Sequence, residues 1–148
     1  MSFSWKSLFS SRGRIGRKTF WSVAIPITVI EIIIQAASGA AGDNPLLLLL
    51  LPVALVCVVI NICNTAKRLH DLGWRGWWMF APVAIVIFVD LLAMAVFGAE
   101  STGAVIVTLL AFLIPLAFLI VLGSRRGDEG PNRFGEPPPT TEPATAAT

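Results

Sequence analysis

Four long apolar runs constrain this sequence more than any other feature. They cover about residues 19–41, 46–66, 77–97 and 104–122. Each run is close to the ~20 residues that a helix needs to cross ~30 Å of hydrocarbon. Charged residues make up only 14% of the 148-residue chain, whereas soluble domains carry about 25%. We therefore expect an all-α fold, an integral membrane bundle of four transmembrane helices, with lipid as the solvent for most of its surface.

The polar segments divide the chain into three parts. Residues 1–18 form a basic segment, residues 19–122 the transmembrane domain, and residues 123–148 a tail. The basic segment is either a short helix lying at the membrane interface or a frayed tail, because several of its apolar side chains fall near helical spacing. These side chains are Phe3, Trp5, Leu8 and Phe9. From about residue 138 the tail is rich in Pro, Thr and Ala, which predicts disorder.

All basic residues lie on one side of the predicted membrane domain. With four spans, one side of the membrane receives residues 1–18, the middle loop at 67–78 and the tail. These three segments hold five, three and three of the eleven Lys and Arg residues. The only charged residues in the two opposite loops are Asp43 and Glu100. The positive-inside rule therefore predicts that both termini are cytoplasmic.

Two acidic residues, Glu31 and Asp90, lie inside apolar spans, where an ionisable group is costly. Their spacing from the start of each span predicts similar depths, so we expect them to face each other or a polar cavity shared with Gln35. One interpretation is a proton or cation site in a small oligomeric transporter or channel subunit. The other is a pair of protonated acids that hydrogen-bond neighbouring helices. We prefer the second, because polar residues often join membrane helices in this way.

The middle loop holds the only histidine, His70, next to Asp71. Adjacent residues on a helix do not face each other, so the two are a poor catalytic dyad if the helix continues to Leu72. Gly73 is expected to end that helix. The sequence has no G-x-S-x-G, phosphate-loop or H-E-x-x-H motif. Basic and Trp residues in this loop favour an anchor at the headgroup level over a membrane enzyme at His70 and Asp71, and we assign no catalytic residue.

The two cysteines, Cys57 and Cys63, fall in one apolar run. Six residues of helix separate them by roughly 9 Å of rise, which is too far for a disulfide bond. We predict that they are small packing residues. Since no Cys and His residues have the spacing of metal ligands, we predict neither a metal site nor a cofactor.

Three motifs surround the spans: Gly13–Trp21 (GRIGRKTFW), Lys67–Trp78 (KRLHDLGWRGWW) and Asn132–Pro137 (NRFGEP). With these motifs in this order, the chain resembles a bacterial inner-membrane family, domain of unknown function 805, the YhaH-like proteins. The resemblance covers roughly residues 3–138. It departs at Lys67, where the family usually has Arg, and at Arg75, where it usually has Ser. It implies a multi-pass protein of the bacterial plasma (inner) membrane, and it implies no activity.

All three motifs fall on the predicted cytoplasmic side, so we expect their residues to form one cluster there. The candidate residues are Arg14, Arg17, Arg68, His70, Asp71, Trp77, Asn132 and Phe134. We also expect three of these arginines, together with Arg75, to meet Asp71, Asp128 or Glu129, and residues 132–137 to fold back beneath the bundle.

The leading functional prediction is a membrane protein whose cytoplasmic face binds a protein partner or anionic lipid headgroups. A homo-oligomer is a further option for the partner. We expect no nucleic-acid binding, because the basic segment before the first span is too short to be a separate module. The transporter subunit and the membrane enzyme remain alternatives.

Overall fold

The structure, a computed structural model, describes residues 5–41, 48–98 and 101–138, and within these ranges every regular element is a helix. The elements are α1 (Trp5–Leu8), α2 (Arg17–Ala41), α3 (Leu51–Asp71), the 3-10 helix η2 (Gly76–Met79), α4 (Phe80–Phe97), α5 (Thr102–Ala111) and α6 (Leu113–Ser124). Four stretches are long and apolar enough to cross a membrane: Arg17–Ser38, Leu51–Asp71, Gly76–Phe97 and Thr102–Ser124. The prediction of an all-α chain with four membrane-spanning helices is confirmed at this level.

Proline and glycine explain where several helices begin, break and end. Pro52 lies in the first turn of α3, where its missing N–H costs nothing, and α3 begins at Leu51. Pro115 cannot donate to the carbonyl of Ala111, and the fourth span is interrupted there, between α5 and α6. Gly73 adopts a φ of +72° just after α3, which confirms that it ends this helix.

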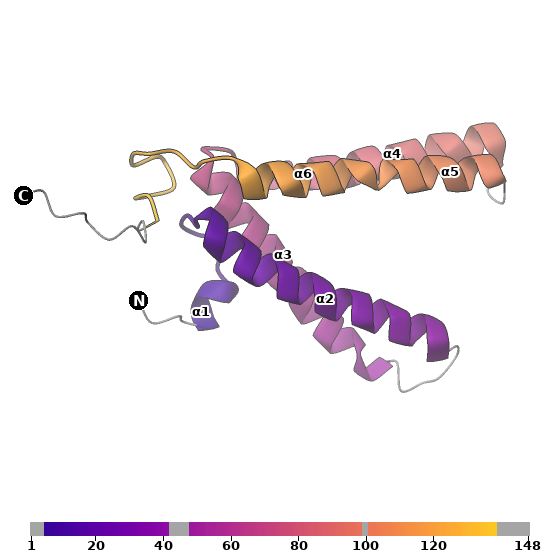
Figure 1. Cartoon of the computed structure of the whole chain (residues 1–148), viewed down its shortest axis with the longest axis horizontal. Helices are drawn as coiled ribbons and strands as arrows, with labels where there is room; N and C mark the ends of the chain where they lie inside the picture. The colour runs from indigo at the N-terminus through magenta and orange to yellow at the C-terminus, as the bar shows by residue number, and fades with distance from the viewer. Residues whose placement is uncertain (1–4, 42–47, 99–100, 139–148) are drawn as a thin grey trace, which may run out of the picture.

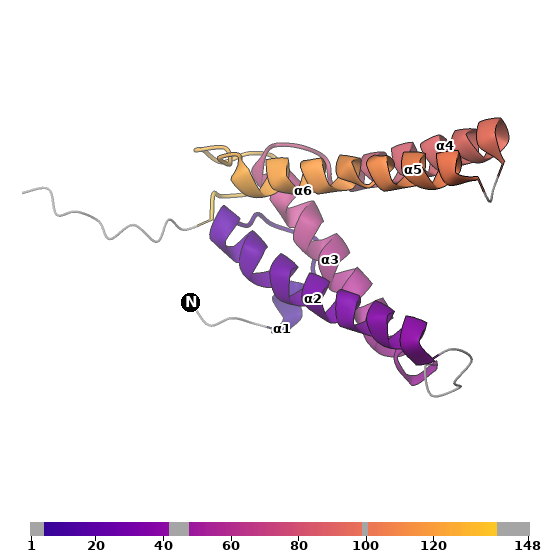
Figure 2. The same cartoon turned by 45° about the vertical axis from the view of Figure 1, so that its right-hand side comes forward.

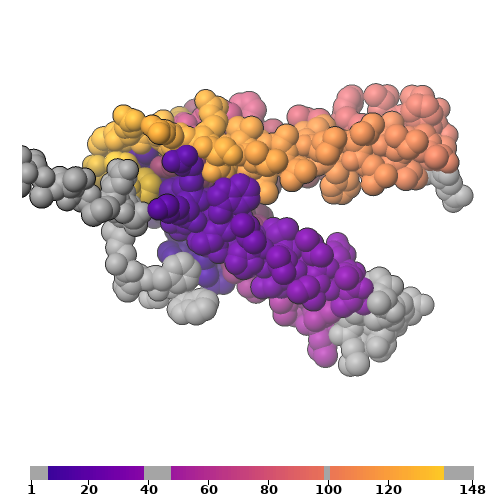
Figure 3. Space-filling view, viewed as in Figure 1, coloured from indigo at the N-terminus to yellow at the C-terminus, as the bar shows by residue number. Residues whose placement is uncertain are grey.

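The helices form two pairs that diverge from a shared end (Figures 1 and 2). In one pair α2 packs against α3. In the other α4 packs against the fourth span, which consists of α5 and α6. Helix α6 also contacts α2 and α3, and it does so at the shared end. Farther away an open wedge separates the pairs (Figure 3). The expected bundle is thus joined at one end only, because apolar helix faces gain little by packing together when lipid can cover them.

The buried residues of α4 and α5 are mostly small. Ala93, Ala104 and Ala111 are buried between α4 and α5, and small side chains of this kind let helix backbones approach closely. Cys57 and Cys63 are buried free thiols on α3, which confirms their predicted packing role. Large apolar side chains instead point outward along all four spans, as a surface in contact with lipid requires.

The apolar core lies at the shared end. It consists of Phe20 and Ala24 from α2, Leu69 from α3 and Leu122 from α6. We call this end the basic end. Besides the core, it comprises α1, the connection at residues 72–75 and the tail from 125 to 138. The opposite loops, with Asp43 and Glu100, lie outside the described residues, as does the tail segment predicted to be disordered after residue 138.

Candidate functional site

The centre of the basic end is Asp71, the last residue of α3, whose carboxylate binds two buried arginines. Arg14 Nε donates to Asp71 Oδ1 at 3.1 Å, and Arg68 Nη1 donates to Asp71 Oδ2. Asp71 is 2% exposed, Arg14 9% and Arg68 0%. One carboxylate between two guanidinium groups leaves an excess positive charge in a buried place, so the arginines need further acceptors. We call these three residues the arginine clasp.

Arg68 finds two of its further acceptors at the end of α6 and a third just before α2. Its Nε donates to the carbonyl of Leu122 at 2.7 Å, its Nη2 donates to the carbonyl of Arg125, and its Nη1 donates to the carbonyl of Ile15 at 3.4 Å. The last carbonyls of a helix have no partner inside the helix, and a cation near them is favourable. Arg68 therefore fastens the end of α6 to α3.

Arg14 binds the tail. Its Nη2 donates to the carbonyl of Asp128 at 2.5 Å, and its Nη1 donates to the carbonyls of Gly130 at 2.7 Å and Gly135 at 3.3 Å. The N–H of Asp128 donates in turn to the carbonyl of Asp71 at 2.8 Å. An arginine from the segment before the first span thus holds residues 128–135 against the end of α3.

The tail closes on itself in a tight turn around Asn132. The backbone groups of Asn132 and Gly135 exchange two hydrogen bonds of 3.1 and 2.9 Å, and Asn132 Oδ1 accepts from the N–H of Phe134. Asn is common in such turns because its side chain bonds to the backbone two residues further on. Asn132 Nδ2 donates to the carbonyl of His70 at 2.9 Å and to the side chain of Asp128 at 3.0 Å. The third motif therefore lies on the second.

His70 is covered by this turn and does not act together with Asp71. The Phe134 ring stacks on the imidazole with centroids 3.9 Å apart and planes 9° apart, and His70 Nδ1 lies 3.3 Å from the carbonyl oxygen of Gly13. The Asp71 carboxylate is directed to the arginines instead. The geometry gives the enzyme interpretation no catalytic dyad, and the described residues contain no cluster of three His, Cys, Asp or Glu side chains that could hold a metal.

The other predicted residues lie at the edge of the clasp or outside it. Arg17 is exposed and donates to the carbonyl of Ser124 at 3.4 Å. Trp77 is exposed and stacks on Trp78, with centroids 4.6 Å apart. Neither Arg17 nor Arg75 forms an ion pair within the described part of the chain, so the expectation that both join the arginine–carboxylate cluster is wrong. Arg75 lies in the turn after α3, where it lines a separate cavity.

Sequence reasoning missed two glycines that the packing requires. A Cβ added to Gly127 would overlap the Asp71 carboxylate, and one added to Gly123 would overlap the indole of Trp21. Trp21 Nε1 also donates to the carbonyl of Gly123 at 3.2 Å, which joins α2 to α6. The available signal was the position of these glycines at the end of the last apolar run, where a close backbone approach is common.

Sequence reasoning also missed the role of Lys67. Its Nζ donates to the carbonyl of Ser7 at 2.6 Å and so attaches α1 to α3. The side chain is buried, which is unusual for a lysine unless its charge finds an acceptor.

The two intramembrane acids each bind a neighbour within their own helix pair. Asn61 Nδ2 donates to both carboxylate oxygens of Glu31, at 3.0 and 3.1 Å, and Thr108 Oγ1 donates to Asp90 Oδ1 at 2.9 Å. Glu31 lies on α2 and Asp90 on α4, in pairs that diverge (Figure 2). The expectation that they face each other is wrong, because the divergence of the pairs separates helices that the span pattern places at equal depth.

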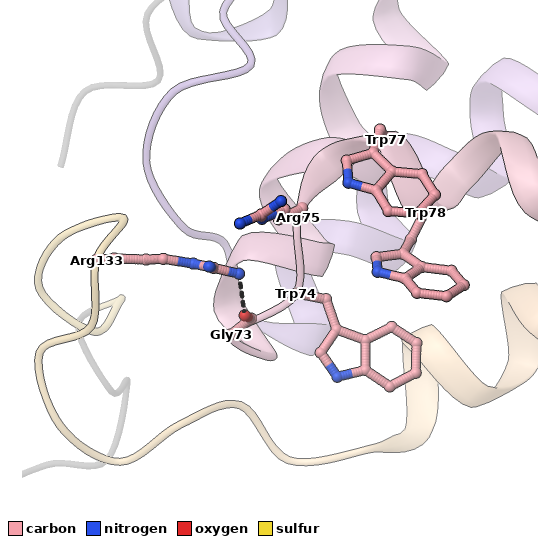
Figure 4. Close-up of a pocket in the computed structure, with 6 residues that line it drawn as sticks. All are labelled: Gly73, Trp74, Arg75, Trp77, Trp78 and Arg133. Carbon is pink, nitrogen blue, oxygen red and sulfur yellow. Dashed lines mark hydrogen bonds between the residues drawn. The ribbon is translucent and has the colours of Figure 1, made fainter.

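A cavity of about 490 Å³ opens at the basic end beside the clasp (Figure 4). Its lining consists of Gly73, Trp74, Arg75, Trp77, Trp78 and Arg133. Arg133 Nη2 donates to the carbonyl of Gly73 at 2.8 Å, so the tail forms one wall. A second cavity, of about 450 Å³, lies beneath α1 and is lined in part by Arg12, Asn64 and Lys67. Neither lining includes His70 or an intramembrane acid.

Comparison with known proteins gives a family without an assigned activity. The family model described as "Protein of unknown function (DUF805)" matches residues 8–136. The uncharacterised protein YiiR of Escherichia coli strain K12 is 30% identical over 132 residues, covering 87% of this chain and 86% of YiiR, and YiiR of Escherichia coli O157:H7 matches equally. No solved structure matches. The match over most of the chain, with the three motifs meeting at one end of the helices, shows that this protein belongs to the DUF805 family.

Proposed function

We propose that this is a multi-pass protein of the bacterial plasma membrane whose basic end lies in the cytoplasm and binds anionic lipid headgroups. The observation that carries the proposal is the charge left exposed once the clasp has formed. Seven basic side chains at the basic end are exposed, against three described carboxylates that are exposed there. The basic residues are Arg12, Arg17, Lys18, Arg75, Arg125, Arg126 and Arg133, and the acidic ones are Asp128, Glu129 and Glu136.

The position of these charges supports a lipid surface as their partner. They surround the ends of the membrane-spanning helices, at the height where phospholipid headgroups lie, and each Lys or Arg near an anionic surface contributes about 1 kcal/mol. The clasp matters because it fixes the tail. Arg133 belongs to the turn bound by Arg14 and His70, so its charge stays beside the spans and does not move freely.

The orientation is tested with reporter fusions. An enzyme reporter that is active only outside the cytoplasm should be silent when fused after Thr148 and active when inserted near Asn44. Active fusions after Thr148 and silent ones near Asn44 would overturn the proposed orientation.

Lipid binding is tested by purifying the full chain in a mild detergent and identifying its lipids and bound proteins by mass spectrometry. We expect anionic phospholipids to be enriched over their share in the host membrane. The variant Arg125→Gln/Arg126→Gln should reduce this enrichment, because both charges are exposed at the end of α6. A retained lipid composition equal to that of the membrane, with a stoichiometric protein bound instead, would refute lipid binding and favour a protein partner.

A further inference from the structure

The cavity beside the clasp combines three tryptophans and two arginines with no acidic residue in its lining. Arg75 comes from the turn after α3, and Arg133 comes from the tail. In Figure 4 both guanidinium groups are seen on one side of the opening, and the rings of Trp77 and Trp78 on the other. The tail supplies Arg133 to this lining because Arg14 and His70 hold the tail turn beside the middle loop.

Positive charge predominates around this cavity, although the exposed carboxylate of Asp128 lies beside Gly73, which is in its lining. Neither Arg75 nor Arg133 forms an ion pair with a described carboxylate, and the guanidinium of Arg125 adds a third positive charge over Trp74, at 5.9 Å from the ring centroid. Neighbouring guanidinium groups repel each other unless an anion lies between them. Planar arginine forks match phosphate oxygens with paired hydrogen bonds, so a phosphate group is the anion that fits best.

The tryptophans indicate where that phosphate comes from. The residues Trp74, Trp77 and Trp78 are 37%, 54% and 43% exposed, and the indole N–H groups of Trp77 and Trp78 find no acceptor within the described ranges. Amphipathic rings of this kind are enriched where headgroups meet hydrocarbon. Phe80, at the start of α4, is also exposed, and it offers an apolar surface to an acyl chain. A free phosphate ion would use only the arginines.

We infer that this cavity binds one anionic phospholipid, with its phosphodiester between Arg75 and Arg133 and its acyl chains along the start of α4. The volume of about 490 Å³ lies in the range of small-molecule sites, about 300–1,000 Å³, and accommodates a glycerophosphate headgroup. The inference rests on the proposed function, because it requires the basic end to lie at headgroup level. It adds a defined site and a stoichiometry of one lipid per chain.

The test is native mass spectrometry of the full chain in mild detergent, titrated separately with phosphatidylglycerol, phosphatidylcholine and inorganic phosphate. One phosphatidylglycerol per chain should be retained, and phosphatidylcholine should bind much more weakly. Arg75→Gln/Arg133→Gln should lower the apparent affinity for phosphatidylglycerol by about tenfold or more, since two charge-assisted contacts are lost. The control Arg12→Gln/Lys18→Gln removes the same charge from the basic end, outside this cavity. It weakens only the general attraction to anionic lipid, so it should lower the affinity clearly less than Arg75→Gln/Arg133→Gln does.

The possible failures separate the site from the proposed function. An equal loss in both double variants would overturn the site and leave general binding of anionic lipid intact. Equal binding of phosphatidylglycerol and phosphatidylcholine would overturn both. Displacement of the lipid by an equal concentration of inorganic phosphate would assign the cavity to free phosphate. If the glutamine pair does not fold, Arg75→Lys/Arg133→Lys keeps the charge without the fork and should still weaken binding, and unchanged affinity in it would refute the phosphate contact.

Discussion

Replacing Asp71 with Asn tests whether the arginine clasp holds the basic end together. Asn keeps the size of Asp and an oxygen acceptor, so the substitution creates no void. It removes the negative charge of the only buried acidic side chain in the described ranges. Arg14 and Arg68 then remain buried without a counter-charge. The amide NH2 of Asn also replaces one of the two acceptor oxygens, so one guanidinium loses its charge-assisted hydrogen bond as well.

The expected magnitude follows from what the arginines retain. Breaking a buried ion pair by removing one partner costs about 3–5 kcal/mol. Six backbone carbonyls still accept hydrogen bonds from the two guanidinium groups, three for each arginine. These acceptors offset part of the lost attraction, so we expect a loss near the lower end, about 3 kcal/mol. For a chain of this length, such a loss lowers Tm by about 6–12 °C.

The assay is thermal unfolding in mild detergent, followed by tryptophan fluorescence, together with limited trypsin digestion. Asp71→Asn should lower Tm and speed cleavage after Arg133, because the tail is released. The control is Asp128→Asn, which neutralises an exposed carboxylate on the same surface and should cost less than about 1 kcal/mol. Equal stability and equal cleavage of the two variants would refute the view that the buried charge fastens the tail.

Three further substitutions test other contacts by the same unfolding assay. Gly127→Ala should lower Tm because its Cβ would overlap the clasp carboxylate. The control Gly130→Ala should not lower Tm, because a Cβ at Gly130 enters open space. Equal Tm values for the two variants would contradict this packing. Gly123→Ala should also lower Tm, and Trp21→Leu should relieve part of that loss in the double variant; simply additive losses would show that the two residues do not clash. Asn61→Leu should cost about 0.6–1.7 kcal/mol, the range for a hydrogen bond between membrane helices, and an unchanged Tm would show that this bond contributes nothing.

The elements of the fold could be predicted from the sequence because a membrane permits few choices. Apolar runs of about 20 residues must be helices in lipid, and Gly73 ends α3 because glycine adopts positive φ without strain. The pairing of the helices was beyond the sequence. Helical spacing gives the depth of Glu31 and Asp90 in the membrane. Their neighbours depend on which helices pack together, and a long apolar run contains little information about that packing.

The candidate site could also be predicted only in part from the sequence. The motifs indicated that arginines, Asp71 and the tail belong to one region, and the structure places Arg14, Arg68, Asp71 and Asn132 there. The strongest partners of the arginines are backbone carbonyls, such as that of Leu122. Every residue has a carbonyl, so no side-chain pattern marks these acceptors. These carbonyls become available to Arg68 only because α6 ends with its last carbonyl groups directed toward that side chain.

The clasp also has a consequence for how the chain is made. Arg14 is synthesised early, and its acceptor at Gly130 follows 116 residues later. At about 5–20 residues per second, the ribosome needs roughly 6–23 s to cover that distance. During this interval all four spans are synthesised, while the guanidinium of Arg14 still lacks its tail carbonyls. The contacts of Arg14 with the tail therefore form only after the last span has been synthesised, whereas Arg14, Arg68 and Asp71 are all present once residue 71 has been made.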